Sequence, residues 1–290
     1  MSLLQLLING VTLGAAYALV ALEFVFIVNA TGAVNFAHGD LVMTGGYVAV
    51  GLGALASVPV LVLLPVVALI MFLIGLVIAA IAYFPLVRRP PATVFISTLL
   101  CGIILQNAFI VLFGPQARAA PPLIAAGVIH LGAIEVSLQS LGTLAIAAAL
   151  IGLQYFIFAR TQIGRRLRAT AQDREMAQAI GIPAHFLIAV TFGFGAALAG
   201  VAGALLDNQF FVCPTGGVPL SVYAYMAVVI GGWGSIAGAV IGATLISVFQ
   251  VVVSAYASYA VATGLLYAAL LVIFFLRPQG IFGERVQRRV

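Results

Sequence analysis

Few side chains in this sequence are placed for acid–base chemistry. His38 and Asp40 stand two residues apart in the stretch GAVNFAHGD, residues 32–40, and Glu23 lies in the apolar stretch ALEFVF. A histidine beside a carboxyl group can relay protons. A lone pair of this kind in a break between apolar runs is more often a hydrogen-bonded hinge. Glu23 is either functional, as membrane carboxyl groups usually are, or able to reach the interface or an arginine.

Other catalytic arrangements are missing from the sequence. No Ser/His pair, HExxH motif or carboxylate pair has the spacing of a hydrolase. All twelve basic residues are arginine, so the phosphate-binding lysine of a Walker A motif is missing too. Cys101 and Cys213 are isolated and form no metal-binding spacing. We therefore predict no catalytic site, no metal site and no cofactor, and assign any ATP hydrolysis to separate chains.

The composition is that of a protein that lies in lipid. Of the 290 residues, 64% are hydrophobic and 7% are charged, whereas soluble domains carry about 25% charged residues. Since a helix needs roughly 20 apolar residues to cross a bilayer, we predict an all-α polytopic membrane protein with about eight or nine transmembrane helices. The apolar runs are 3–28, 41–57, 60–87, 93–114, 138–159, 184–206, 220–255 and 258–276.

The net charge of +5 reflects orientation in the membrane. The arginines cluster at ends of apolar runs, which is the positive-inside pattern, and no folded basic face for nucleic acid is present. The connections 115–137 and 207–219 are poor in arginine and are predicted to face outward, which places the N-terminus outside. The predicted cytoplasmic groups are Arg88 with Arg89, the cluster 160–174, and Arg277 with Arg285, Arg288 and Arg289.

Two stretches predict broken or re-entrant elements. The run 220–255 is too long for one span and short for two, and Gly231, Gly232 and Gly234 lie at its centre. A descending helix, a glycine break and an ascending helix would fit it. The polar residues 32–40 form the other candidate. Transporters place such irregular backbone where it lines a cavity.

Small residues recur at four-residue spacing in two of these runs. Such stripes let helices approach closely in lipid. Packing within the subunit is favoured over a dimer seam, and both remain open. The stripes are Gly234, Gly238 and Gly242, and Gly195, Ala199 and Gly203.

A polar island at 160–183 interrupts the apolar runs and predicts a docking helix. Thr170 is the predicted N-cap of a helix near 171–180, with Asp173 and Glu175 in its first turn. Gly181 and Pro183 would end the helix. Met176 and Ile180 share one face, which would fit a groove on a soluble partner. The alternative is a solvated loop whose arginines only set orientation, but that role requires no capped helix.

The stretch GRRLRATAQDREMAQAIGI resembles the cytoplasmic loop of permeases in branched-chain amino acid ABC importers. The stretches INGVTLGAAYALVAL, VNFAHGDLVMTGGYV, ISTLLCGIILQN, VTFGFGAALAGVAGALL and VIGGWGSIAGAVIGATL also resemble this family, in particular its smaller permease. The resemblance implies one transmembrane permease domain, 1–290, in the bacterial inner membrane, with the coupling loop at 160–183. The coupling residues would be Arg165, Arg166, Arg168, Asp173, Glu175, Met176, Ile180 and Gly181.

The same resemblance implies an assembly around the chain. Its members would be a second homologous permease subunit, two cytoplasmic ATPase subunits and a periplasmic substrate-binding protein. Two features depart from the family pattern: Glu23, where an uncharged residue is expected, and the short loop 115–137.

An aliphatic amino acid is a zwitterion with an apolar tail, so its route needs neutral dipoles, helix ends and loosened backbone. Hydrogen bonding between helices explains Asn35 and Gln106 equally well. The candidate path residues are Asn35, His38, Asp40, Gln106, Asn107, Gly231, Gly232 and Gly234.

The leading interpretation is a permease subunit that forms half of the path for branched-chain or related hydrophobic amino acids by alternating access. One alternative is a proton-coupled carrier of small amino acids or amides, in which Glu23 or the His38–Asp40 pair titrates. Another is the same ABC permease role for urea or short amides. An intramembrane enzyme ranks last, because it lacks paired catalytic groups.

Overall fold

A computed structural model describes residues 2–55, 59–120, 122, 127–131, 134–207, 211–276 and 280. Over these residues the chain forms eleven α-helices and one two-stranded hairpin. The helices are α1 Leu3–Thr31, α2 His38–Leu55, α3 Val60–Ile78, α4 Pro91–Phe113, α5 Leu138–Arg160, α6 Gln162–Gln172, α7 Arg174–Ala179, α8 Ala184–Leu206, α9 Gly217–Gly231, α10 Ile236–Tyr256 and α11 Tyr259–Leu276. The strands are β1 Val128–Leu131 and β2 Ile134–Ser137, and α3 continues through the π-turn Ala79–Tyr83 and the 3-10 turn Phe84–Leu86.

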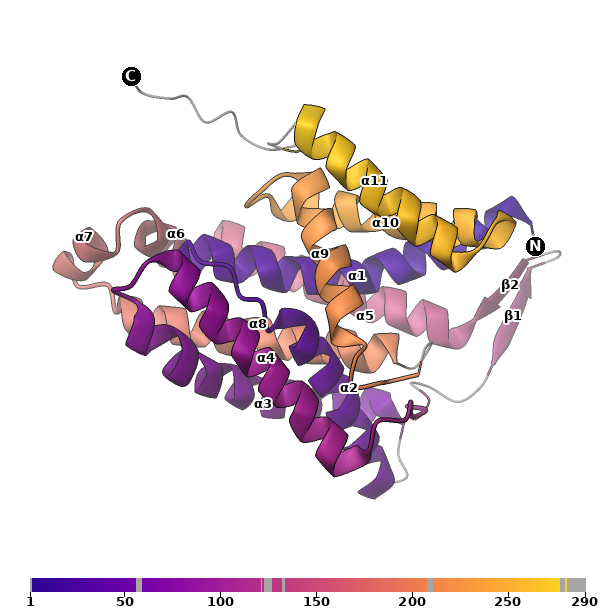
Figure 1. Cartoon of the computed structure of the whole chain (residues 1–290), viewed down its shortest axis with the longest axis horizontal. Coiled ribbons are helices and arrows are strands. Elements are labelled where there is room, and N and C mark those ends of the chain that lie inside the picture. The colour runs from indigo at the N-terminus through magenta and orange to yellow at the C-terminus, as the bar shows by residue number, and fades with distance from the viewer. Residues whose placement is uncertain are drawn as a thin grey trace.

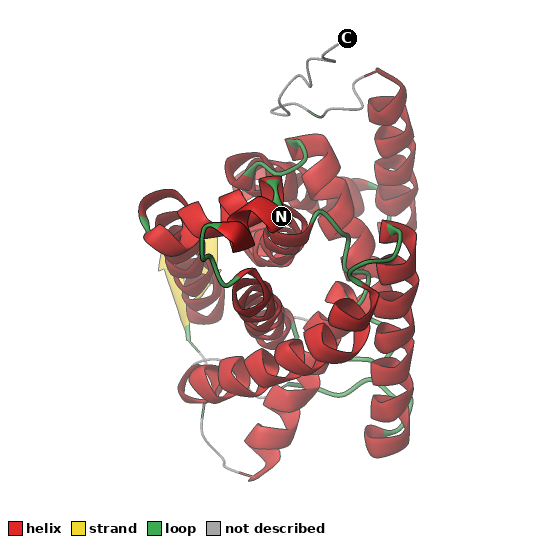
Figure 2. Cartoon of the chain, turned by 90° about the vertical axis from the view of Figure 1, so that its left-hand side faces the viewer, coloured by secondary structure: helices red, strands yellow, loops and turns green. Residues whose placement is uncertain are grey.

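In this part of the chain, six helices are long and apolar enough to cross a membrane, and two shorter apolar helices, Gly217–Gly231 and Tyr259–Ile273, accompany them. The prediction of a polytopic helical protein is therefore confirmed. The fold is not purely α-helical as predicted, because the described chain also contains the two-stranded hairpin. Figure 2 shows that helices make up nearly all of the described chain, with the strands at one edge. The C-terminal group Arg277, Arg285, Arg288 and Arg289 lies outside the described residues.

Helix α1 is the centre of the bundle. Every residue from Ala16 to Ile27 is buried, so neighbours cover all of its faces. It packs against α5, α8, α9 and α10. A helix that is apolar on all sides has no face to turn toward solvent, and burial inside a bundle is the arrangement expected for it.

Glycine allows these helices to approach closely. A Cβ on Gly10 would lie 2.8 Å from the Cα of Val248 on α10. A Cβ on Gly238 of α10 would overlap the carbonyl of Gly231 on α9, and one on Gly203 would overlap the carbonyl of Val42 on α2. Gly203 and Gly238 of the small-residue stripes thus pack helices within the subunit, as the favoured prediction stated, whereas Gly234 lies in the turn before α10.

The long axis of the molecule has two different ends (Figure 1). Helices α6 and α7 form one end, and we call it the α7 end. The N-terminus and the hairpin lie at the opposite end, which we call the hairpin end. Helix α8 starts beside α7 and runs back along the bundle. With 23 residues at about 1.5 Å each, it is roughly 35 Å long.

Both predicted interruptions are present. Helix α9 has only 15 residues, about 22 Å, which is shorter than the hydrocarbon core of roughly 30 Å. The chain then turns at Gly232 and Gly234, with φ of 105° and 79°, before α10 starts. After α1 ends at Gly32, with φ 66°, the chain folds back so that the ring of His38 meets Phe24 inside the bundle at 5.3 Å. Helix α2 therefore begins within the bundle rather than at its end.

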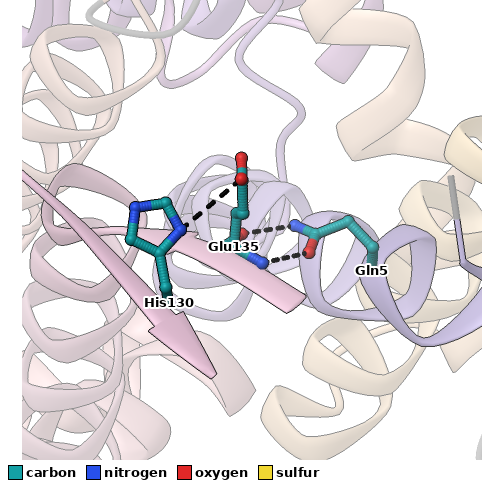
Figure 3. Close-up of polar contacts among 3 residues, drawn as sticks. All are labelled: Gln5, His130 and Glu135. Atoms are coloured by element: carbon teal, nitrogen blue, oxygen red, sulfur yellow. Dashed lines mark hydrogen bonds and ion pairs between the residues drawn. The ribbon is translucent and has the colours of Figure 1, made fainter. Parts of the chain in front are cut away.

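The hairpin is attached to α1 by one side chain (Figure 3). The Gln5 amide donates to the carbonyl of Glu135 at 2.8 Å and accepts from its N–H at 3.0 Å. Within the hairpin, His130 lies opposite Glu135, with Nδ1 3.5 Å from Oε1. Because both side chains are exposed, this ion pair contributes little to stability.

Candidate functional site

A cavity of about 700 Å³ lies in the half of the bundle nearer the hairpin end. Its volume is within the range typical of small-molecule sites. The first half of α1, the end of α8, the start of α9 and the end of α10 form its wall. Most of the lining is apolar, including Leu6, Leu13, Leu220 and Val251.

A chain of neutral hydrogen bonds crosses one side of the cavity. The Tyr17 hydroxyl donates to Oε1 of Gln250 at 3.2 Å, and Nε2 of Gln250 donates to the Tyr223 hydroxyl at 3.4 Å. That hydroxyl lies 2.9 Å from the hydroxyl of Tyr259. The rings of Tyr17 and Tyr223 stack with centroids 5.4 Å apart. These groups offer dipoles without net charge, the kind of lining that passes a zwitterion without trapping it.

Two residues that line the cavity each carry a buried side-chain oxygen without a hydrogen-bond partner among the described residues. These atoms are Oγ of Ser254 and Oδ2 of Asp207. Asp207 is the C-cap of α8, and its backbone N–H bonds to the carbonyl of Gly203. Its carboxylate lies directly over Gly46 of α2, where a Cβ would overlap Oδ2. Sequence reasoning missed this residue, although it is an acidic residue in a connection without arginine.

Beyond the cavity, toward the α7 end, aromatic rings fill the bundle. Phe24 of α1 packs against the rings of Tyr225 at 6.0 Å and Trp233 at 5.8 Å, and also against His38. Tyr225 and Trp233 meet each other at 5.9 Å. Trp233 lies in the break between α9 and α10, so this aromatic cluster connects the break to α1.

The predicted path residues of 32–40 lie in one buried network. Asn35 donates to Oε1 of Glu23 at 3.3 Å and accepts from the N–H of Ala37 at 3.1 Å. Nδ1 of His38 lies 2.9 Å from the carbonyl of Asn35, and Nε2 lies 3.3 Å from that of Ser221. This is the geometry of a hydrogen-bonded hinge. Asp40 is not part of it, since its Oδ1 has no partner among the described residues.

Glu23 has no cation beside it among the described residues. It is fully buried, and Asn35 is the hydrogen-bond partner of Oε1, while Oε2 has none. The side chain therefore does not reach the interface, so that interpretation was wrong. Its contacts are internal, and a Cβ on Gly195 of α8 would lie 3.1 Å from its Cγ.

The remaining path candidates are scattered. Asn107 is exposed, and its amide donates to the carbonyl of Ile103 on its own helix at 2.8 Å, while Gln106 is half-buried. Gly231, Gly232 and Gly234 form the turn between α9 and α10, where Asn29 of α1 donates to the carbonyl of Gly234 at 3.0 Å. None of the eight predicted path residues is on the cavity wall. Their role in transport stays a prediction.

The polar island folds as two helices instead of one. Helix α6 covers Gln162–Gln172 and is capped by Thr161, and α7 covers Arg174–Ala179. The predicted cap at Thr170 was wrong: its hydroxyl donates to the carbonyl of Arg166 inside α6. Asp173 caps α7 instead, because its Oδ1 accepts from the N–H of Met176 at 2.9 Å. The extended backbone of Asp173 makes it the boundary, and its short carboxylate satisfies an otherwise unpaired donor.

Helix α7 presents an apolar surface at the end of the molecule. Met176 is 66% exposed and Ile180 is 75% exposed, while Ala177 between them is buried against the body. Gly181 ends the helix with φ 83°, as predicted. Glu175 lies exposed in its first turn.

The arginines of α6 differ in their contacts. Arg165 and Arg166 are exposed. Arg168 is exposed as well, but it also donates to the carbonyl of Phe158 near the end of α5. This bond ties α6 to the bundle.

Comparison with known proteins matches residues 6–276 to the family described as "Branched-chain amino acid transport system / permease component". The chain is 33% identical to the high-affinity branched-chain amino acid transport system permease protein BraD of Pseudomonas aeruginosa, over 97% of this chain and 96% of that protein.

The similarity extends to two further relatives. The chain is 34% identical to the LivH permease protein of Salmonella typhimurium, over 97% of this chain and 96% of the relative. It is 27% identical to a probable LivH permease of Methanocaldococcus jannaschii, over 91% of this chain and 88% of the relative. Each relative is named as a transport permease, and the chain is likewise a permease subunit of a transport system in the membrane. The chain belongs to the family of branched-chain amino acid transport permeases.

Proposed function

We propose that the chain forms half of the translocation path of an ATP-driven importer for branched-chain or related aliphatic amino acids. A second homologous permease would form the other half, two cytoplasmic ATPase subunits would supply the energy, and a periplasmic binding protein would deliver the substrate. In this arrangement the α7 end faces the cytoplasm and the hairpin end faces outward. The cavity then belongs to an outward-facing state.

The observation that carries the proposal is the apolar surface of α7. Met176 and Ile180 leave most of their area exposed at the tip of the molecule, beside the exposed Arg165 and Arg166 of α6. An apolar knob with charges around it fits a groove on a soluble subunit.

Helix α8 supplies the mechanical link. It begins at Ala184, beside α7, and ends at Leu206, next to the cavity residue Asp207. Most of its residues are buried against α2, α3 and α1, and a packed helix moves as a rigid element. Movement of α7 by an ATPase would thus shift the cavity wall and the aromatic cluster around Phe24. That is alternating access by displacement of whole helices.

The experiment measures amino acid uptake by the reconstituted assembly and co-purification of the ATPase subunits with the permease. Met176→Asp and Ile180→Asp place a charge in the docking face, and each is expected to release the ATPase subunits and reduce uptake at least tenfold. Gln178→Ala, on the same helix but outside that face, is the control and should behave as wild type. Wild-type uptake together with retained ATPase in both aspartate variants would refute the coupling role.

A further inference from the structure

We propose that Asp207 is the site at which the cavity holds the positively charged amino group of its substrate. The inference rests on the proposed transport function and deepens it, since it names the ionic group that this permease recognises.

Charge on the cavity wall is limited to this residue. Among the described residues that line the cavity, Asp207 is the one with a charged side chain. Its Oδ2 is buried without a hydrogen-bond partner, and no ion pair involves it in the described chain. Arg118 forms no ion pair with Asp207, and its guanidinium donates to the carbonyl of Phe113 from Nε at 3.1 Å and from Nη2 at 2.6 Å. This carboxyl group therefore has two ways to be neutralised, by binding a proton or by a cation that enters the cavity.

The position of Asp207 makes a bound cation more favourable still. It caps the C-terminus of α8, where the helix dipole is negative and a carboxylate is repelled. An acidic side chain at this end of a helix does not help the fold. A cation beside it relieves both the dipole repulsion and the loss of hydration. Residues that break a local stability rule are commonly functional.

The rest of the cavity fits the remainder of an aliphatic amino acid. Leu6, Leu13, Leu220 and Val251 provide an apolar wall for a branched tail. Ser254 also lines the cavity, and its hydroxyl, which has no hydrogen-bond partner among the described residues, can donate to a carboxylate. An ammonium group brings three donors that an anionic carboxylate can accept.

The Asp207 site distinguishes two classes of substrate, amines and neutral amides. A zwitterionic amino acid has an ammonium group for Asp207, whereas urea and short amides are neutral. A neutral amide offers Asp207 no positive charge, whereas an ammonium group can form a charge-assisted hydrogen bond with its carboxylate. The site thus favours amines over amides of the same shape.

The test uses the complete importer without its binding protein, in lipid nanodiscs, and measures ligand binding by isothermal titration calorimetry. The probes share one tail: isopentylamine is a cation, 4-methylpentanamide is neutral and 4-methylpentanoate is an anion. The variants are Asp207→Asn, which removes the charge with little change in shape, and Glu135→Gln, which removes an exposed carboxylate outside the cavity.

Wild type and Glu135→Gln are expected to bind isopentylamine at least tenfold more tightly than 4-methylpentanamide, and Asp207→Asn should lose that preference. Equal binding of amine and amide by wild type would overturn the proposal, and this comparison needs no variant. An amine preference that survives in Asp207→Asn would overturn it as well.

Leucine uptake with the binding protein present separates this inference from the proposed function. If wild type imports leucine but shows no amine preference, the Asp207 site is wrong and the importer role stands. If wild type binds isopentylamine through Asp207 but imports no aliphatic amino acid, the site is supported and the proposed substrate is wrong.

Discussion

The carboxylate of Asp207 lies on the backbone of Gly46, and no side chain could stand between them. A Cβ at position 46 would overlap Oδ2 of Asp207 and lie 2.7 Å from its Cγ. Because Gly46 has no side chain, α2 leaves room for the carboxylate of Asp207, which is the one charged group of the described cavity wall. Gly46 is a positioning residue for this carboxylate.

Gly46→Ala is therefore expected to displace Asp207 and to reduce leucine uptake by the assembly at least tenfold. The control is Gly51→Ala on the same helix, where the nearest atom to an added Cβ is 3.8 Å away. Radiolabelled uptake measured at equal amounts of purified complex would decide. Normal uptake in Gly46→Ala would show that the placement of Asp207 does not matter for transport.

The direction in which pH changes the contribution of the Asp207 carboxyl to stability can be predicted. Burial raises the pKa of Asp207 well above its usual range, because it disfavours the charged form. The folded protein then holds this proton more tightly than the unfolded chain. Its contribution to the free energy of unfolding therefore decreases as pH rises from the usual aspartate pKa through the folded pKa.

Isopentylamine binding should change in the opposite sense, since the cation competes with the proton and binds better as pH rises. Arg118 and Cys213 are the other charged and titratable groups that influence neighbouring Tyr47 along with Asp207. Titrations at several pH values compare wild type with Asp207→Asn. If Asp207→Asn shows the same pH dependence of isopentylamine binding as wild type, another group is responsible for that dependence.

Asp173 is expected to control the order of α7. Asp173→Ala removes the acceptor for the N–H of Met176, and loss of an N-cap costs about 1 kcal/mol of helix stability. Asp173→Asn keeps an oxygen acceptor and is the matched control. Hydrogen exchange over residues 174–180 should rise by about fivefold in the alanine variant, with a parallel loss of ATPase co-purification. Unchanged exchange would mean that packing alone holds α7.

Gly238→Ala tests the close packing of α9 on α10. The added methyl would overlap the carbonyl of Gly231, and overpacking typically costs 1–3 kcal/mol, taken here as about 2 kcal/mol. Thermal unfolding in detergent should move to lower temperature. Gly264→Ala on α11 has nothing within 4 Å of its added Cβ and should unfold like wild type. Equal unfolding temperatures would contradict the packing described here.

Gln5→Ala is expected to free the hairpin from α1. It removes both hydrogen bonds to the backbone of Glu135, so hydrogen exchange over residues 128–131 and 134–137 should increase severalfold. Glu135→Gln keeps those backbone bonds and loses the exposed ion pair with His130, so it should exchange like wild type. If the hairpin contacts the binding protein, that protein should stimulate ATPase activity less in Gln5→Ala than in wild type, and Glu135→Gln should respond like wild type.

Much of the fold could be predicted because lipid constrains single segments strongly. The apolar run 184–206 coincides with α8 Ala184–Leu206, and 138–159 differs from α5 Leu138–Arg160 by one residue at the C-terminal end. The glycine break inside 220–255 was also correct. In contrast, the capping of 160–183 depended on competition between Thr161, Thr170 and Asp173, all of which are good caps. Local sequence does not decide which of three comparable caps prevails.

The sequence by itself determined the membrane-spanning helices, the glycines that end or join them, and the polar segment with Met176 and Ile180, because each depends on the composition of one short stretch. Only the tertiary structure decided where the cavity lies. Tyr17, Asp207, Tyr223 and Gln250 are separated by up to 233 residues in the chain. They surround one space because α1 lies at the centre and α8, α9 and α10 pack around it. The arrangement of packed helices, and not any local pattern, left Asp207 without an ion-pair partner among the described residues.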